Sequence, residues 1–110
     1  MNNKSRKQKG RRLQNHVRDR LLKAFPHLKA EDIKVAIMSE PGPDIKLSRI
    51  AKKLIPYQWE CKNQEKMKTI YQWFNQCRRH GNLEPILVIK QNSREELAVL
   101  RLDQLIDLIR

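Results

Sequence analysis

The chain has 110 residues, a length that suits one domain, and its 39% hydrophobic content supports a compact core. Lys and Arg total 24 against 12 acidic residues, which gives a net charge of +12. No apolar run is long enough to cross a membrane, and the basic N-terminus lacks the apolar segment of a secretory signal. We therefore expect a protein that acts inside the cell, with a nucleic acid as its partner rather than a merely solvated basic surface.

The cysteines and histidines give no sign of a zinc site. Cys61 and Cys77 lack CxxC spacing and have no histidine arranged nearby in a zinc pattern. We expect both to be free core thiols in a reducing compartment. The three histidines, His16, His27 and His80, are far apart in the sequence, and no chemistry is assigned to them.

The N-terminal part of the chain divides into an arm and a helix. Residues 1–10 are polar and basic, and we expect a flexible arm there, with the folded domain in residues 11–110. A helix should follow, because apolar residues recur at helical spacing at Leu13, Val17, Leu21, Ala24 and Leu28. Pro26 should end it near Ala24 or Phe25.

Three strands are expected next, at residues 33–38, 44–48 and 57–62. A turn rich in Pro and Gly separates the first two, while residues 49–56 could form either a helical turn or a loop. Along the third strand the odd-numbered side chains, from Tyr57 to Cys61, should face one way and the even-numbered ones, from Gln58 to Lys62, the other. Because Trp59 and Cys61 turn inward, we expect this strand to be central.

The C-terminal half begins with a helix and a buried strand. Met67, Ile70, Phe74 and Cys77 follow the helical period, and residues 83–90 contain an apolar run typical of a central strand. Residues 93–110 could form one helix opened by a capping box at Ser93. We prefer a strand at 97–102 and a short final helix capped by Asp103. The prediction is a single α/β domain in the order α-β-β-β-α-β-β-α, with a central mixed sheet flanked by helices.

One constellation of residues in this pattern carries chemistry. Glu60 and Lys62 lie two apart in a predicted strand and should share a face, and Asp44 begins the neighbouring strand. Two converging carboxylates repel unless a hard divalent cation lies between them, and Mg²⁺ takes oxygen ligands while keeping open positions. A nearby ammonium could orient or deprotonate the attacking water. Such a set is minimal for hydrolysing a phosphodiester.

These residues resemble a known family. Pro43-Asp44 followed by Glu60-Cys61-Lys62 resembles the PD-(D/E)XK nuclease signature, and the string 60–64 is similar to small phage-type nucleases and Holliday-junction resolvases. The resemblance implies a restriction-endonuclease-like fold and a gene from a phage or mobile element. It also implies catalytic roles for Asp44, Glu60 and Lys62. The implied ligands of Mg²⁺, for which Mn²⁺ should substitute, are Asp44, Glu60 and the carbonyl of Cys61.

Further site residues are less well defined by the resemblance. Members of this superfamily often add an acid from the first helix, but this chain has Gln14 and Asn15 there, with Asp19 a turn later. Gln14 could be a weak ligand or an ordinary exposed residue. Glu40 is another candidate. Gln64 could touch the phosphate, orient Lys62 or cap the following helix.

The expected DNA contacts are basic residues of the arm and of the segment between the two catalytic strands, namely Lys7, Lys9, Arg11, Arg12, Arg49, Lys52 and Lys53. Phosphate contacts position a substrate without reading its sequence, and no helix is obviously built to read a groove. Tyr71 and Trp73 could stack on bases, but their helical spacing favours the core. We therefore expect structure-selective cleavage.

Three functions remain open from the sequence. The first is a branched-DNA endonuclease that acts as a homodimer, since symmetric cuts on a four-way junction need two sites. The second is a nicking, homing or repair nuclease of the same superfamily. The third is a non-catalytic basic DNA-binding module, against which the complete set of Asp44, Glu60 and Lys62 argues. An RNA-directed role ranks lower, because no RNA-binding signature is present.

Overall fold

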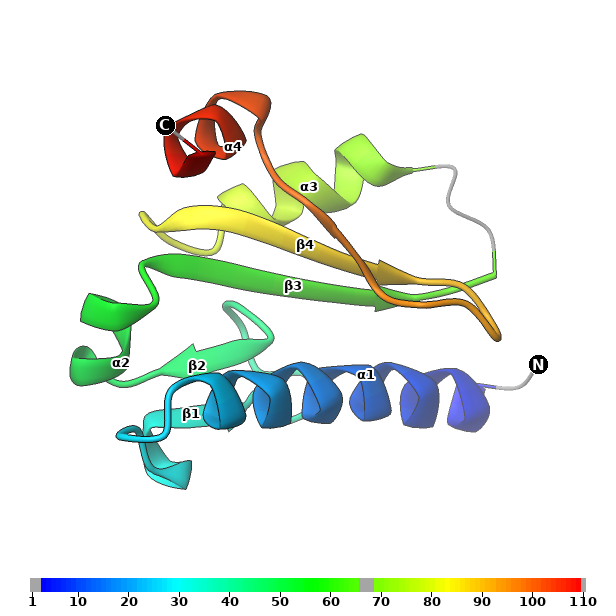
Figure 1. The fold of residues 1–110 in the computed structure, drawn as a ribbon. Helices are drawn as coiled ribbons and strands as arrows, with labels where there is room; N and C mark the ends of the chain where they lie inside the picture. Colours follow the sequence, from blue (N-terminus) through cyan, green and yellow to red (C-terminus); the bar gives the residue numbers. More distant parts are fainter. Residues whose placement is uncertain (1–2, 66–68, 110) are drawn as a thin grey trace.

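The computed structural model describes residues 3–65 and 69–109, and its elements are labelled in Figure 1. In chain order they are α1 (Asn3–Ala24), η1 (Ala30–Asp32), β1 (Ile33–Val35), β2 (Ile45–Leu47), α2 (Arg49–Leu54), β3 (Tyr57–Asn63), α3 (Ile70–Arg78), β4 (Glu84–Lys90), β5 (Leu97–Val99) and α4 (Leu102–Ile109). The α/β class and the predicted order are confirmed. To that order the structure adds η1, and it adds α2 in the segment that the sequence left open. No described helix is both long and apolar enough to cross a membrane.

The strands form two sheets instead of the one expected. β1 and β2 pair antiparallel, while β3 runs parallel to β4 and β4 pairs antiparallel with β5. β4 is therefore the central strand, and the prediction that β3 is central is wrong, because β3 lies at the edge of its sheet. The hairpin is attached to that edge through Asp44, whose N–H donates to the Trp59 carbonyl at 3.0 Å. The ladder stops there because the Asp44 side chain accepts the next N–H, that of Cys61.

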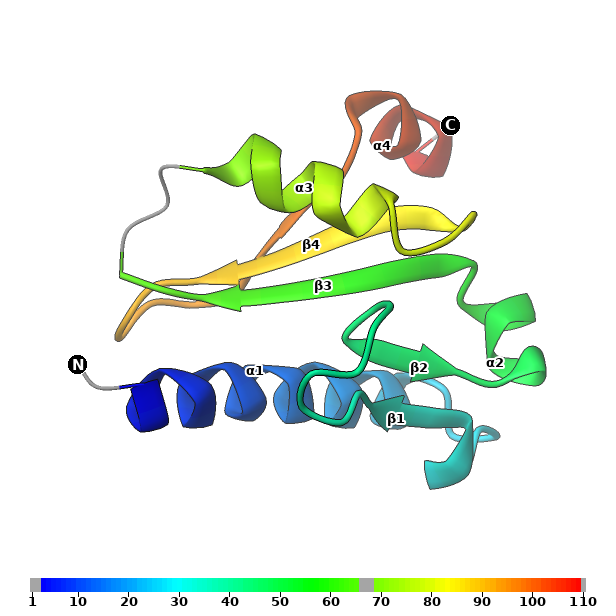
Figure 2. The same cartoon turned by 180° about the vertical axis from the view of Figure 1, so that it is seen from behind.

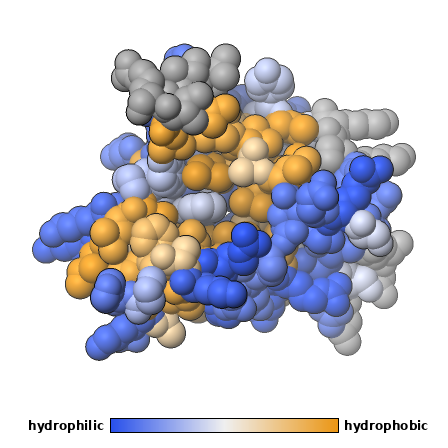
Figure 3. All heavy atoms as spheres, in the orientation of Figure 1, coloured by the Kyte–Doolittle hydropathy of each residue, from blue (hydrophilic) through white to orange (hydrophobic). Residues whose placement is uncertain are grey.

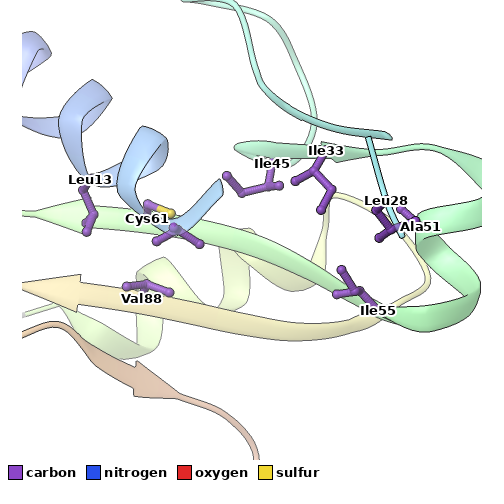
Figure 4. Packing of buried hydrophobic residues seen from close by; sticks show 9 residues of the cluster. Leu13, Leu28, Ile33, Ile45, Ala51, Ile55, Cys61 and Val88 are labelled. Carbon is purple, nitrogen blue, oxygen red and sulfur yellow. The ribbon is translucent and has the colours of Figure 1, made fainter. Parts of the chain in front are cut away.

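Apolar residues pack on both faces of the three-stranded sheet, and Figures 1 and 2 show the resulting layers. One core cluster joins α1 and the β1–β2 hairpin to β3 and β4, with Cys61 and Val88 beneath Leu13 (Figure 4). The other joins α3 to the opposite face through Phe74 and Leu87. Both cysteines are buried free thiols, as predicted. Layers on both sides leave the polar residues of β3 little access to solvent.

Helix α1 is longer than the sequence suggested. Its first described residue is Asn3, so residues 3–10, expected to be a flexible arm, form helical turns. Lys, Arg and Gln are good helix formers, and no proline interrupts them. Asn63 Nδ2 also donates to the Lys9 carbonyl at 3.3 Å, which ties these turns to the end of β3. The helix ends at Ala24, as Pro26 predicted.

Smaller differences concern element ends. β1 stops at Val35 instead of residue 38, and Ile37 and Met38 are exposed. Asp103 lies in the first turn of α4, not at its cap. Tyr71, expected to favour the core, is 84% exposed. Trp73 packs against the core cluster that contains Phe74 and Leu87. Met67, expected in the helix before β4, lies outside the described residues.

Candidate active site

Three side chains predicted to act together come together near the end of β3. Glu60 is only 3% exposed, and Lys62 Nζ lies 3.5 Å from its Oε1 atom. Alternation along β3 explains this pair, because residues two apart share a face. Asp44 precedes β2, where its Oδ2 atom accepts the Cys61 N–H at 2.8 Å. That bond holds the second carboxylate at the edge of the strand that carries Glu60.

Both carboxyls hold their protons more tightly than usual. Burial raises the pKa of Glu60 from its ordinary 4.5 to about 7, and the Asp44 charge adds to the rise while Lys62 opposes it. Burial likewise raises the pKa of Asp44, against the Cys61 N–H and the charge of Lys62. Both shifts come mainly from burial, which disfavours the charged form of each carboxyl.

His80 is a member of this site that sequence reasoning missed. Its Nε2 atom lies 3.2 Å from Glu60 Oε2, whereas Lys62 pairs with the other oxygen, Oε1. Glu60 Oε2 is buried and makes no hydrogen bond within the described residues. His80 follows the end of α3, which returns the chain toward the start of β3 because parallel strands need a crossover. The predicted order of strand, helix and strand was the signal in the sequence that could have placed His80 near β3.

Gln58 fixes the turn that presents His80. The buried Gln58 amide nitrogen donates to the carbonyls of Cys77 at 2.8 Å, Gly81 at 3.1 Å and Arg78 at 3.2 Å. Its Oε1 atom accepts the Leu83 N–H at 2.9 Å. A Cβ atom at position 81 would lie 2.6 Å from this oxygen, so the close approach requires glycine. The buried Gln58 amide thus supplies hydrogen-bond partners to backbone groups at the end of α3 and in the loop after it.

Replacing Gln58 with Leu should lower the free energy of unfolding by about 2–4 kcal/mol, because several buried backbone groups lose their partner. Urea denaturation would measure the loss. The matched control is Gln72→Leu at an exposed position of α3, which should change stability by no more than about 0.5 kcal/mol. Equal stabilities of the two variants would refute the role given to Gln58.

The residues present fit a hard divalent cation. Glu60 offers a buried oxygen with no hydrogen-bond partner among the described residues, and Asp44 contributes a second carboxylate. The Cys61 carbonyl faces the same edge of β3 as its N–H, which points to Asp44. No three described His, Cys, Asp and Glu side chains are grouped to hold a metal by themselves. A metal here would therefore need oxygen from the backbone and water, as Mg²⁺ accepts.

The additional site residues fall into two groups. Gln14 and Glu40 line a hollow of about 250 Å³ with Asp44, and a hydrogen bond from Gln14 lowers the pKa of Asp44. Glu40 is already engaged, since it accepts the Ile37 N–H at 2.8 Å and lies 3.4 Å from Lys46 Nζ.

Gln64 is exposed and lines a pocket of about 590 Å³ with Lys62. It does not cap α3, whose N-cap residue is Thr69. Among the helix residues considered as a fourth ligand, Asp19 is exposed and pairs with Arg18 at 2.8 Å.

The basic residues expected to contact DNA divide between two places. Lys7 and Arg11 line the hollow beside Asp44, and Lys9 lines the pocket beside Lys62. Arg12 faces a third pocket next to these. On the face that Figure 3 draws, hydrophilic residues cover the side of the molecule where the N-terminal part of α1 lies. Helix α2, with Arg49, Lys52 and Lys53, instead precedes the start of β3 and lies at the end of the strand away from Lys62 (Figure 1).

Comparisons with protein-family models, with curated proteins and with solved structures find no match.

Proposed function

We propose that this protein is a metal-dependent endodeoxyribonuclease that hydrolyses DNA phosphodiesters, as the resemblance to PD-(D/E)XK nucleases implies. The observation that carries the proposal is the buried Glu60 carboxylate between Lys62 and His80, with Asp44 beside it. The Glu84–Arg101 ion pair lowers the pKa of its carboxyl, whereas burial raises the pKa of both Asp44 and Glu60. Perturbed carboxyls beside a cationic helix are what a phosphodiester hydrolase needs.

Asp44, Glu60 and the Cys61 carbonyl would hold the metal ion, with Mg²⁺ the expected species and Mn²⁺ a substitute. Bound there, a divalent cation would supply a bound water of lowered pKa and neutralise charge on the phosphate. It would also offset the mutual repulsion of the two carboxylates.

Residues of the chain itself would orient the attacking water, stabilise developing charge and hold the DNA. Lys62 Nζ, 3.5 Å from Glu60 and 25% exposed, is placed to donate to the attacking water and to stabilise charge developing on the phosphate. The Cys61 N–H fixes one oxygen of Asp44, so that carboxylate cannot rotate away. The cations of α1 would attract the phosphate backbone and hold the strand without reading its sequence.

Structure-selective cutting is the finer part of the proposal. Its support is that the α1 cations near the site line hollows beside Asp44 and Lys62, where they would contact phosphates rather than base edges. On a four-way junction two symmetric cuts need two sites, so we propose a homodimer for this substrate.

We expect the protein, with Mg²⁺, to cut a labelled four-way junction about ten-fold or more faster than a linear duplex of the same sequence. A ten-fold preference corresponds to about 1.4 kcal/mol of differential transition-state binding. Gel assays with junction, flap and linear substrates at equal ionic strength would measure it. Equal rates on all three would keep the nuclease and remove the junction preference. Tight binding with no cutting in either Mg²⁺ or Mn²⁺ would favour a non-catalytic binding module.

A further inference from the structure

The pocket that Arg12 faces lies outside the carboxyl ends of the two parallel strands. β3 and β4 end side by side, with Asn63 opposite Lys90, and both arrows point toward the N-terminal end of α1 (Figure 1). The pocket has a volume of about 570 Å³ between α1 and the segment that follows β4. In open α/β sheets, the loops after the carboxyl ends of parallel strands are where ligands bind.

The lining of this pocket is suited to an anion. Its cations, Lys9, Arg12 and Lys90, come from two elements that are far apart in the sequence. Glu96 is the one acid among the lining residues, and its carboxylate is engaged by His16 Nε2. The amides of Asn63 and Asn92 and the hydroxyl of Ser93 complete a polar wall. A ligand with several negatively charged oxygens matches this set.

Several groups here keep hydrogen-bonding capacity for a ligand. Among the described residues, Lys90 Nζ donates to the Gln91 carbonyl at 3.3 Å, and an ammonium has two further donors to offer. The Asn63 amide donates to the Lys9 carbonyl, while its Oδ1 atom is buried without a hydrogen-bond partner in the described part of the chain. Lys9 Nζ contacts Asn92 Oδ1, which joins the two walls.

The pocket adjoins the one that contains Lys62 in the candidate active site. Lys9 and Asn63 line both this pocket and the one that contains Lys62. A ligand that fills both must carry anionic groups in series, as a polynucleotide strand does.

We infer that this pocket binds a phosphodiester next to the reacting one, with Lys90 and Arg12 as its main contacts. The inference rests on the proposed function and extends it. Lys90, at the end of β4, would then bind the substrate strand from the side opposite α1. It adds a DNA contact outside the basic segments that the sequence singled out.

Binding at several salt concentrations tests the inference. Affinity for a fluorescently labelled duplex would be measured by anisotropy in EDTA, which prevents cleavage. Lys90→Ala should reduce the slope of log K against log salt by about 0.9, the value for one phosphate contact on B-DNA. Lys34→Ala, which removes an equal charge from an exposed position of β1, should leave the slope unchanged. Arg12→Gln, at an exposed helix position, should repeat the Lys90 effect if Lys90→Ala fails to fold.

A wild-type slope in both Lys90→Ala and Arg12→Gln would overturn the inference. The wild-type protein would be assayed for Mg²⁺-dependent cleavage in parallel. Cleavage together with unchanged slopes would reject the pocket and retain the proposed function. Failure of the wild-type protein both to bind and to cut DNA would reject the two together.

Discussion

Glu60→Gln should make the protein more stable at pH 8 in the absence of metal, by about 3 kcal/mol in the free energy of unfolding. Burial and the Asp44 charge raise the pKa of Glu60 from 4.5 to about 7. Between these values the native state binds a proton that the unfolded chain releases. The stabilisation is therefore complete below pH 4.5 and is lost as the pH rises through about 7. A neutral amide of the same size carries no such cost.

Urea denaturation of wild type and Glu60→Gln at pH 4, 6 and 8 in EDTA would measure the effect. The two proteins should be nearly equal at pH 4 and diverge toward pH 8. Mg²⁺ should then stabilise wild type at pH 8 more than the variant, because it binds the folded site. A variant less stable than wild type at pH 8 in EDTA would show that Glu60 is compensated by its neighbours.

Glu84 offers a matched control with the opposite sign. Its carboxylate accepts from Arg101 Nη2 at 2.6 Å and Nε at 2.7 Å, and these bonds lower its pKa. Stability from a lowered pKa is present at neutral pH and is lost as the pH falls. Glu84→Gln should therefore destabilise the protein at pH 8, and the difference should shrink in acid. The opposite pH dependences of the two variants would distinguish a buried carboxyl with a raised pKa from a carboxylate in a structural ion pair.

Lys62→Ala should reduce the rate of DNA cleavage by about 10²–10³-fold, the usual effect of removing one positioned donor to developing charge. Single-turnover rates on a labelled substrate with Mg²⁺ would measure the loss, and affinity in EDTA should change far less. Lys34→Ala removes the same charge from exposed β1 and should cut at the wild-type rate. Lys62→Arg should also be impaired, because a planar guanidinium does not replace a compact ammonium.

Folding of the Lys62→Ala variant needs its own check. Lys62 lowers the pKa of Glu60, so its removal leaves that buried carboxylate with less compensation. Circular dichroism at the assay pH would show whether the variant is folded. A folded Lys62→Ala protein that cuts at the wild-type rate would remove Lys62 from the catalytic set.

The sequence predicted which side chains of β3 share a face, because the signals for this are local. Alternation placed Glu60 and Lys62 on one face, and the turn before Asp44 placed a second carboxylate at the neighbouring strand. Helix α1 ends at Ala24, as Pro26 predicted. These inferences need only the period of a strand and the chemistry of turns.

What the sequence missed depended on long-range placement. His80 reaches Glu60 only because α3 carries the chain back across the sheet, and Gln58 is buried only because it closes the end of that helix. Polar residues on one face of a strand normally predict that this face is exposed to solvent. The sequence therefore did not indicate that both faces of β3 are buried. The split into two sheets depends on one side chain, that of Asp44, replacing a backbone acceptor.

Local signals were also misjudged in two places. A run of basic residues indicated a flexible arm, although the same residues favour helix and extend α1 to Asn3. The sequence of residues 49–56 allows a helical turn or a loop, yet Ser48 is a good N-cap, and its Oγ atom accepts the Ala51 N–H at 3.1 Å. The capping signal at Ser48 therefore identifies the start of α2.

The most direct test of the nuclease assignment is cleavage of a labelled four-way junction by the wild-type protein with Mg²⁺, with EDTA, and by Lys62→Ala with Mg²⁺. We predict cutting in the first reaction only, apart from a slow residual rate in the third. If the folded wild-type protein binds the junction but does not cut it in Mg²⁺ or Mn²⁺, the nuclease assignment is wrong.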